Sequence, residues 1–339
     1  RSTLMRSSAA SDVYKRQRLY CEAAQFIIED NPEFMERALN IPKEIGERIR
    51  ASWGADELSL YGRFDFILAK DGTPKILEFN ADTPTSLLEA SVIQWQWKED
   101  VFPECDQFNG IHEGLVQSWK DIFPKKGEIH FAGALENNED TGTLQYLAST
   151  AMEAGFSTRV LDMQALDLQN GRFFDPAGEL VNRCFKLYPW EWMVDESPDG
   201  CLAEMEWLEP IWKLVMSNKA ILATLYELFP DSPYVLPCYL SRPRSGLFCK
   251  KPVFSREGHN VSVVDIRDWE EYVRIAETEG DYNTGAYVYQ EYVEPTAYSG
   301  RYPVIGSWII GGEAAGIGIR ENRMEVTDNL SEFVPHIIG

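Results

Sequence analysis

The pattern of hydrophobic and polar positions changes several times along the 339-residue chain. Apolar residues recur at helical spacing from residue 19 to residue 50, which predicts helices there. Residues 128–185 alternate short apolar runs with a helical pattern, which predicts strand, helix and strand in a parallel α/β unit. A long helix is predicted over residues 204–229, with Lys219 in a polar interruption. From residue 234 onward, β-branched and aromatic residues broken by Gly and Pro predict a mixed sheet.

Two segments with period-two alternation flank an Asp-Gly pair at residues 71–72. This pattern predicts a β-hairpin with a two-residue type I′ turn. Such a turn places Asp65 opposite Glu78, and on the same face it places Arg63 opposite Asn80. Two carboxylates about 5 Å apart repel each other unless a positive charge lies between them. Hard oxygen ligands of this kind suit Mg²⁺, and a solvated acidic strand face is the alternative interpretation.

A helix is predicted directly after the hairpin. Thr85 or Ser86 can cap it, and Glu89 follows Ser86 at capping-box spacing. The free backbone N–H groups of such a helix start suit a ligand carboxylate or phosphate. The predicted metal-binding face would therefore adjoin an anion site.

Three further stretches carry polar residues that suit a nucleotide site. Residues 249–264 predict a strand with Lys251, a polar loop containing Gly, and a returning strand, so that N–H groups and a Lys charge could cover phosphate oxygens. Gln290 and Glu291 interrupt an apolar strand, and Arg320 emerges from a strand with spaced glycines. Each stretch alone also fits an ordinary exposed hairpin, an edge strand or a surface ion pair.

Composition mainly excludes classes of partner. A formal net charge of -22 disfavours nucleic acid and anionic membranes, and its field attracts cationic substrates. No apolar run approaches the ~20 residues of a membrane helix. Six cysteines without C-x-x-C spacing indicate reduced thiols and a cytoplasmic protein. Residues 1–17 are rich in Ser and Arg, which predicts a non-native or disordered tail.

Several stretches together resemble the synthetase part of the glutathionylspermidine synthase family of ATP-grasp carboxylate–amine ligases. The resemblance covers most of residues 58–339 and rests on SLYGRFDFILAKDGTPKILEFNADTPTS, ENNEDTGTLQYL, FKLYPWEWM, KPVFSREGHNVS and IGSWIIGGEAAGIGIRENR. It implies a mixed α+β and α/β fold with ATP-grasp architecture, in which the metal-binding strands precede the nucleotide-binding lobe in a permuted order. It also implies transfer of the ATP γ-phosphoryl group to a carboxylate, followed by attack of an amine on the acyl phosphate.

The resemblance assigns roles to individual residues. Asp65, Glu78 and Asn80 correspond to ligands of Mg²⁺, while Arg63 and Arg320 correspond to catalytic groups at the transferred phosphate. Contacts with ATP are implied for Lys219, Lys251, Ser255, Arg256, Glu257, Gly258, Gln290 and Glu291. Contacts with the acid and amine substrates, of which glutathione and a polyamine are the leading candidates, are implied for Thr83, Thr85, Ser86, Glu139 and Asp140.

Three regions are expected after the tail. They are a helical region with the metal-binding hairpin (18–127), a pre-ATP-grasp α/β lobe (128–203), and a nucleotide-binding region with its flap at 249–264 (204–339). The bifunctional members of the family carry an amidase domain ahead of the synthetase, and no amidase activity is expected from this chain. The sequence does not predict an oligomeric state.

Two other functions compete with a ligase. A non-catalytic nucleotide-binding protein would keep Lys251 and Glu291 without turnover. A glycoside hydrolase could use Asp65 and Glu78 as its pair of carboxylates and tryptophans as sugar platforms. Such a hydrolase would need no ATP and would have no use for the Lys251 flap.

Overall fold

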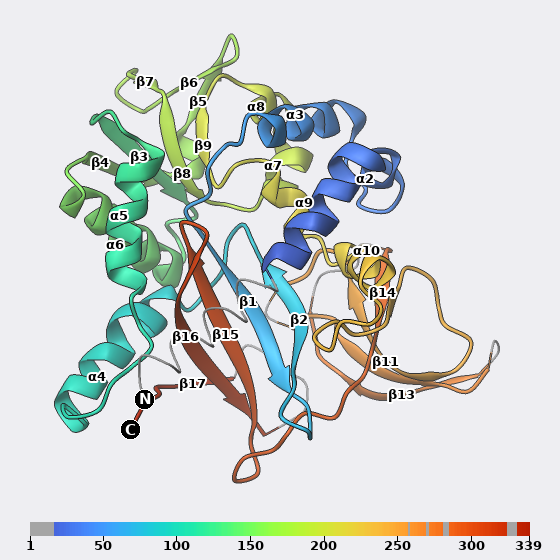
Figure 1. The fold of residues 1–339 in the computed structure, drawn as a ribbon. Coiled ribbons are helices and arrows are strands. Elements are labelled where there is room, and N and C mark those ends of the chain that lie inside the picture. Colours follow the sequence, from blue (N-terminus) through green and yellow to red (C-terminus); the bar gives the residue numbers. More distant parts are fainter. Residues whose placement is uncertain (1–16, 257, 269–270, 281–284, 324–330) are drawn as a thin grey trace.

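The computed structural model describes residues 17–256, 258–268, 271–280, 285–323 and 331–339. Within these residues the chain forms two antiparallel five-stranded sheets, one parallel four-stranded sheet and a three-stranded meander (Figure 1). The expected mixed α/β class, with both parallel and antiparallel sheets, is therefore confirmed. The described residues contain no helix that is both long enough and apolar enough to cross a bilayer.

The first antiparallel sheet joins the predicted hairpin to strands from the C-terminal part of the chain. Its order is β17-β16-β15-β1-β2, so β1 lies between its hairpin partner and β15 (Figure 1). All of its strand pairs are antiparallel. The strands are β1 (Tyr61–Leu68), β2 (Pro74–Asn80), β15 (Tyr302–Ile310), β16 (Glu313–Asn322) and β17 (Glu332–Val334).

The second antiparallel sheet carries the predicted flap. Its order is β10-β14-β11-β12-β13, and it lies beyond the β2 edge of the first sheet, together with α10 (Ile221–Leu228) (Figure 1). The flap is confirmed as a hairpin, because β11 pairs with β12 in antiparallel register. The strands are β10 (Cys238–Tyr239), β11 (Gly246–Pro252), β12 (Ser262–Ile266), β13 (Tyr272–Glu277) and β14 (Tyr287–Glu291).

The parallel sheet confirms the predicted strand, helix and strand. Its order is β4-β3-β8-β9, and α6 connects β3 to the parallel β4. The strands are β3 (Glu128–Gly133), β4 (Ser157–Asp162), β8 (Arg183–Leu187) and β9 (Glu206–Leu208), with α5 (Ile111–Ile122) and α6 (Asn138–Glu153) beside them. A short helix and the meander follow β4: η3 (Met163–Ala165), β5 (Asp167–Gln169), β6 (Arg172–Phe174) and β7 (Leu180–Val181).

Helices precede the hairpin, as predicted, and another helix follows it. Residues 17–25 are helical, and the helix after the hairpin begins at residue 87. The remaining helices are η1 (Phe26–Asp30), α2 (Glu33–Arg37), α3 (Lys43–Gly54), η2 (Glu89–Ile93), α4 (Gln94–Val101), α7 (Trp190–Glu196), α8 (Pro198–Leu202), α9 (Lys213–Ser217) and α10 (Ile221–Leu228).

The single long helix predicted over residues 204–229 is wrong. The structure has β9 followed by two short helices, which are separated at Asn218 with an extended ψ of 122°. The Asn218 side chain accepts a hydrogen bond from the N–H of Ala220 (2.9 Å) and donates one to the carbonyl of Leu39 (3.2 Å). The bond to Ala220 is local and the bond to Leu39 is tertiary, and together they replace helical bonds. The break places Lys219 in a turn, where its N–H donates to the carbonyl of Val253, directly after β11 (2.8 Å).

The hairpin has the predicted partners but not the predicted turn. The N–H of Ala69 donates to the carbonyl of Thr73 (3.0 Å), so the turn contains three residues, and Gly72 takes a positive φ of 81°. A β-bulge between Asp65 and Phe66 shifts the register by one further residue. The odd turn and the bulge together give the offset that a two-residue turn would give.

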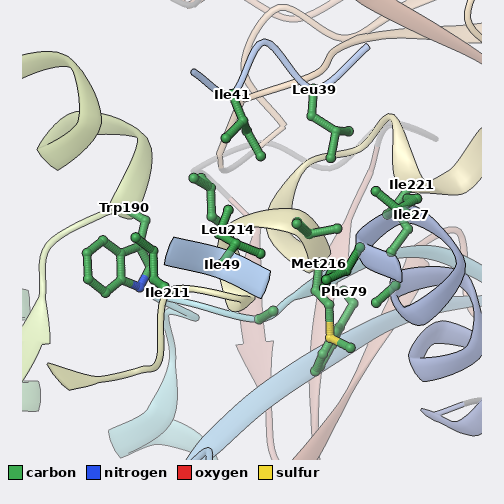
Figure 2. Close-up of a cluster of buried hydrophobic side chains, with 14 of the residues drawn as sticks. Ile27, Leu39, Ile41, Ile49, Phe79, Trp190, Ile211, Leu214, Met216 and Ile221 are labelled. Atoms are coloured by element: carbon green, nitrogen blue, oxygen red, sulfur yellow. The ribbon is translucent and has the colours of Figure 1, made fainter. Parts of the chain in front are cut away.

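A shared hydrophobic core fixes the acidic strand β2 relative to the helices. Phe79 of β2, Ile27 of η1, Leu214 of α9, Ile221 of α10 and Trp190 of α7 are all at most 6% exposed and belong to one cluster (Figure 2). The cluster therefore connects the first antiparallel sheet to the helix break that carries a lysine. Polar groups on these two elements are held in fixed relative positions.

Candidate active site

The acidic face of the hairpin is covered by arginines rather than by solvent. Asp65 accepts hydrogen bonds from Arg63 Nε (2.6 Å) and Nη2 (2.9 Å), and from Arg320 Nη2 (2.7 Å). The side chains of Asp65 and Arg63 are each only 5% exposed, so the interpretation of a solvated strand face is wrong. Burial lowers the pKa of Arg320, as does the nearby charge of Arg63, and the charge of Asp65 opposes that shift.

Gly306 of β15 leaves room for the Arg63 side chain. It pairs with Asp65 across the sheet, and a Cβ atom on it would lie 2.8 Å from Arg63 Cδ and 3.3 Å from Arg63 Nε. Any larger residue would push the guanidinium away from its carboxylate. No role was predicted for this glycine from the sequence, although a glycine inside an apolar strand is a known sign of close approach.

Glu78 is the second acid on this face and is held ionised. Its Oε2 lies 3.0 Å from Lys219 Nζ, and its Oε1 accepts a hydrogen bond from Asn80 Nδ2 (3.3 Å). Burial acts to raise the pKa of Glu78, but the charges of Lys219, Lys251 and Arg63 outweigh burial and lower it to about 2. Glu78 is therefore a carboxylate across the neutral range.

Lys251 and Gln290 connect the second sheet to the hairpin. Lys251 Nζ donates to Gln290 Oε1 (2.7 Å) and to the carbonyl of Leu77 (3.3 Å). Gln290 Nε2 in turn donates to the carbonyl of Ile76 (3.0 Å). Because β14 lies between β10 and β11, Gln290 is not on an edge strand, and that alternative is wrong.

These groups line one cavity between the two antiparallel sheets, which we call the cationic cavity. Five cationic side chains and three carboxylates line it, so its formal charge is positive in a chain of net charge -22. Such a cavity attracts an anionic ligand. Its charged lining residues are Arg63, Lys219, Lys251, Arg256, Arg320, Asp65, Glu78 and Glu291, and its polar lining includes Asn80, Thr83, Thr85 and Gln290.

A second cavity adjoins the first at the start of α6, and we call it the acidic cavity. The Asn137 side chain caps α6 by accepting from the N–H of Glu139 (2.9 Å), so Glu139 and Asp140 lie in the first turn. Its lining includes Thr83, Thr85, Asn137, Glu139, Asp140, Tyr188, Trp192 and Arg256. Thr83, Thr85 and Arg256 line both cavities. The two cavities are therefore neighbours with a common wall.

Other predicted residues lie at different places. Ser86 lines neither cavity; it takes a left-handed φ of 66°, and its backbone carbonyl rather than its side chain accepts a hydrogen bond, from the N–H of Ala90. The Ser255 carbonyl accepts from Lys219 Nζ (2.5 Å). Gly258 lines the cationic cavity, and Glu257 lies outside the described residues.

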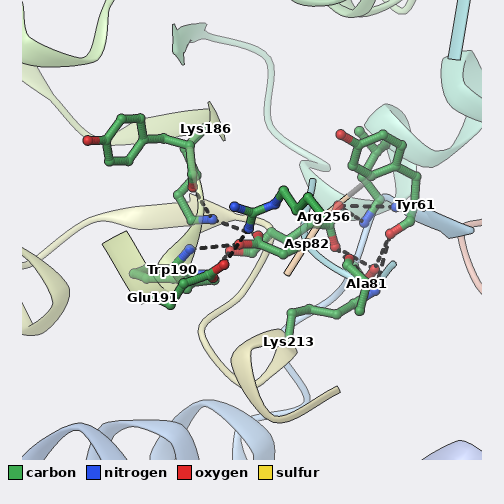
Figure 3. A network of polar contacts seen from close by, with 12 residues as sticks. Tyr61, Ala81, Asp82, Lys186, Trp190, Glu191, Lys213 and Arg256 are labelled. Carbon is green, nitrogen blue, oxygen red and sulfur yellow. Dashed lines mark hydrogen bonds and ion pairs between the residues drawn. The ribbon is translucent and has the colours of Figure 1, made fainter. Parts of the chain in front are cut away.

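Arg256 of the flap turns toward α7. Its Nη2 lies 2.5 Å from Glu191 Oε1 (Figure 3). Its guanidinium lies 5.4 Å from the centre of the Trp192 ring. The flap is thus joined to the lobe of the parallel sheet by an ion pair. The family resemblance implied a contact between Arg256 and ATP, and no role was predicted for Glu191.

A fully buried ion pair, which was not predicted from the sequence either, lies in the wall behind the site. Lys186 Nζ of β8 lies 2.6 Å from Asp82 Oδ1, and both side chains are at most 1% exposed (Figure 3). The N–H of Trp190 donates to Asp82 Oδ2 (2.8 Å). Burial lowers the pKa of Lys186, and Asp82 counteracts that shift. The pair ties the end of β2 to β8 and α7.

The donor set suits magnesium bound together with phosphate. Mg²⁺ in nucleotide sites commonly takes one or two carboxylates from the protein and the remaining oxygens from phosphate and water. Asp65 and Glu78 supply two hard carboxylates, and Asn80 lies within 3.3 Å of both. The described residues contain no group of three or more His, Cys, Asp or Glu that could hold a metal alone. A metal here would therefore depend on ligand oxygens.

Comparison with known proteins places this chain in a family. The family model described as "Glutathionylspermidine synthase preATP-grasp" matches residues 7–339. The chain belongs to the glutathionylspermidine synthase family. The Haemophilus influenzae protein named "Putative acid--amine ligase" is 39% identical over 303 residues, covering 85% of this chain and 77% of that protein. The relatives are named as ligases and synthetases, which confirms the expected class of ATP-dependent carbon–nitrogen ligase.

More distant relatives are longer, and solved structures share the fold. The bifunctional glutathionylspermidine synthetase/amidase of Escherichia coli is 26% identical over 355 residues. The match covers 94% of this chain, which spans about half (56%) of the length of that protein. A glutathione synthetase-like effector from Globodera pallida has a TM-score of 0.57 at 11% identity, covering 98% of this chain and 87% of its own. This last likeness concerns the fold alone.

Proposed function

We propose that this protein joins a carboxylic acid to an amine through an acyl-phosphate intermediate formed from ATP. One observation carries the proposal: a cationic cavity and an acidic cavity lie side by side and share Thr83, Thr85 and Arg256. An anionic phosphate donor fits the first cavity and a cationic amine fits the second. The acid to be activated would lie where the two cavities meet.

ATP would occupy the cationic cavity. Lys251 and Lys219 would contact its phosphates, with Ser255, Arg256 and Gly258 of the flap above them. Leu77 and Leu236 give the cavity an apolar part that suits adenine, next to Gln290 and Glu291. Mg·ATP carries about two negative charges, which the positive lining of the cavity would balance.

Arg63 and Arg320 would stabilise charge on the phosphoryl group during transfer. Both guanidinium groups are anchored by Asp65, so they are oriented before substrate binds. Asp65, Glu78 and Asn80 would hold Mg²⁺, which when bound neutralises phosphate charge and orients the triphosphate. The carboxylate oxygen attacks the γ-phosphorus, ADP leaves, and the amine then displaces phosphate from the acyl carbon.

Glutathione and a polyamine such as spermidine are the first substrates to test. They are the compounds in the printed names of the more distant relatives. Glu139 and Asp140, with the rings of Tyr188 and Trp192, give the acidic cavity the carboxylate and aromatic surfaces that suit a chain of ammonium groups. The division into regions at 18–127, 128–203 and 204–339 is part of the same proposal.

The test is release of ADP from Mg·ATP across a panel of peptides and polyamines. We expect ADP release to require both an acid and an amine. Lys251→Ala should lower kcat/KM for ATP by about 10²-fold, because a buried phosphate contact is lost. Lys70→Ala, which removes an exposed lysine of the hairpin turn, is the matched control and should change little.

The competing functions give different results in this assay. A non-catalytic nucleotide-binding protein would bind ATP but release no ADP with any pair of substrates. A glycoside hydrolase using Asp65 and Glu78 would act without ATP. Either result would overturn the ligase proposal.

A further inference from the structure

A third, smaller cavity is lined by both members of the Arg256–Glu191 ion pair, and we call it the buried polar cavity. It is bounded by the end of β2, the start of α7, the break after α9 and the flap. Arg256 and Thr83 line this cavity as well as the cationic and acidic cavities. The buried polar cavity therefore meets the other two at the place where the acyl phosphate would form.

Within the part of the chain that the structure describes, three oxygen atoms on side chains lining this cavity have no hydrogen-bond partner. They are Glu191 Oε2, Ser217 Oγ and Ser255 Oγ, and all three atoms are buried. A buried polar atom without a partner costs about 1–3 kcal/mol, so three around one cavity indicate a polar ligand. Each of the three atoms can accept a hydrogen bond.

The chemistry of these acceptors matches a nitrogen that carries hydrogens. A carboxylate oxygen and two hydroxyl oxygens can accept the N–H donors of one amine or ammonium group. The Glu191 carboxylate is already fixed, because its other oxygen is held by Arg256 Nη2 at 2.5 Å. The carboxylate of a residue that lines the cavity is thus held in one orientation.

We propose that the buried polar cavity takes the attacking nitrogen of the amine substrate and that Glu191 accepts its proton. This inference rests on the proposed ligase function. The amine gives one proton to solvent and then attacks the acyl carbon with its lone pair. The C–N bond forms, the bond from carbon to the phosphate oxygen breaks and inorganic phosphate leaves. The remaining surplus N–H proton passes to Glu191 Oε2, because the nitrogen becomes acidic as the bond forms.

The experiment compares two amines with glutathione, or with the acid that the panel selects, in the Glu191→Gln variant. Spermidine needs a proton acceptor, whereas hydroxylamine traps acyl phosphates without one. We expect amide formation with spermidine to fall by about 10²-fold or more. Hydroxamate formation and ADP release with hydroxylamine should stay within about 3-fold of the parent protein, since acyl-phosphate formation is not affected.

Two further variants make the result specific. Ser217→Ala removes one acceptor from the cavity and should raise KM for spermidine several-fold, with unchanged hydroxamate formation. Asp195→Asn, which changes an exposed acid of the same helix as Glu191, should behave like the parent protein. Thermal unfolding of each variant shows whether it is folded at the assay temperature.

The outcomes separate this inference from the function on which it rests. Equal losses with both amines in Glu191→Gln would mean that Glu191 only holds Arg256, and would overturn the inference. Full activity with both amines would overturn it as well. A parent protein that forms no amide, no hydroxamate and no ADP with any acid would instead refute the ligase function, and the inference would fall with it.

Discussion

The cationic and acidic cavities share a wall but differ in how their charges are held. In the cationic cavity Asp65 is paired with two arginines and Glu78 with a lysine, so these two carboxylates are fixed by cations. In the acidic cavity Glu139 and Asp140 lie in the first turn of a helix, where the helix dipole favours negative charge. The first cavity is a rigid arrangement for an anion, and the second offers negative charge to a cation.

The difference indicates how one chain can handle two substrates of opposite charge. A phosphoryl group needs oriented donors, which paired and buried arginines supply. A chain of amines needs negative charge nearby, but the orientation of the carboxylates matters less than the orientation of the donors to a phosphoryl group. Mutations in the two cavities should therefore affect different kinetic constants. Four predictions, ordered from the largest expected effect to the smallest, test this difference and the pairing of the carboxylates.

Asp65→Asn should abolish turnover, with a loss in kcat of about 10³-fold or more, because both arginines lose their common anchor. The measurement is ADP release with saturating substrates, below the unfolding temperature of the variant. Asp71→Asn in the exposed turn of the same hairpin is the control. Full activity in Asp65→Asn would remove this carboxylate from the mechanism.

Glu78→Gln should destabilise the protein in a way that depends on pH. The pKa of Glu78 is lowered from 4.5 to about 2 on folding, so its stabilisation is complete above pH 4.5 and is lost as pH falls toward 2. We expect a difference in unfolding free energy of about 3 kcal/mol at pH 7. Denaturant unfolding from pH 7 to pH 3 should show that difference falling by about half between pH 4.5 and 3. A difference independent of pH would contradict the ion pair with Lys219.

The double change of Glu139→Gln and Asp140→Asn should raise KM for spermidine by about 30-fold, from two contacts of about 1 kcal/mol each. KM for ATP should stay within about 2-fold, since the cationic cavity is unchanged. Steady-state kinetics with each substrate varied in turn measures both constants. Glu136→Gln, an exposed acid just before α6, is the matched control. An equal rise in both constants would refute the separation of the two cavities.

Gly306→Ala should lower kcat by about 10-fold, because the added Cβ lies 2.8 Å from Arg63 Cδ and tilts the guanidinium. Gly54→Ala, with no atom within 4 Å of its added Cβ, is the control and should be neutral. Initial rates of ADP release at matched stability decide the comparison. An unchanged rate in Gly306→Ala would show that the exact position of Arg63 is unimportant.

The sequence predicted the local part of this site well. Arg63, Asp65, Glu78 and Asn80 share a face because a short hairpin with alternating positions leaves few other registers. Even so, the register arose from a three-residue turn and a bulge rather than from a type I′ turn. The turn length and the bulge each shift the register, and only their combined offset decides which residues pair. The same register can therefore arise from a two-residue turn or from a three-residue turn with a bulge.

The long-range part of the site could not be predicted from patterns. Arg320 reaches Asp65 across the sheet, and Arg256 reaches Glu191 from another lobe. Such pairs depend on how sheets and helices pack, which periodicity does not encode. The prediction of one long helix over residues 204–229 was wrong for a similar reason. The side chain of Asn218 makes one tertiary and one local hydrogen bond, and these end a helix that the neighbouring residues favour.

The most direct test of the account follows an oxygen atom from acid to phosphate. Glutathione labelled with ¹⁸O in its carboxyl groups, or the acid that the ADP assay selects, is turned over with Mg·ATP and an amine. The phosphate and nucleotide products are then analysed by mass spectrometry. The account predicts one ¹⁸O atom in inorganic phosphate for each amide formed. Amide formation with unlabelled phosphate, or with the label in AMP, would contradict transfer of the γ-phosphoryl group to the carboxylate in the cationic cavity.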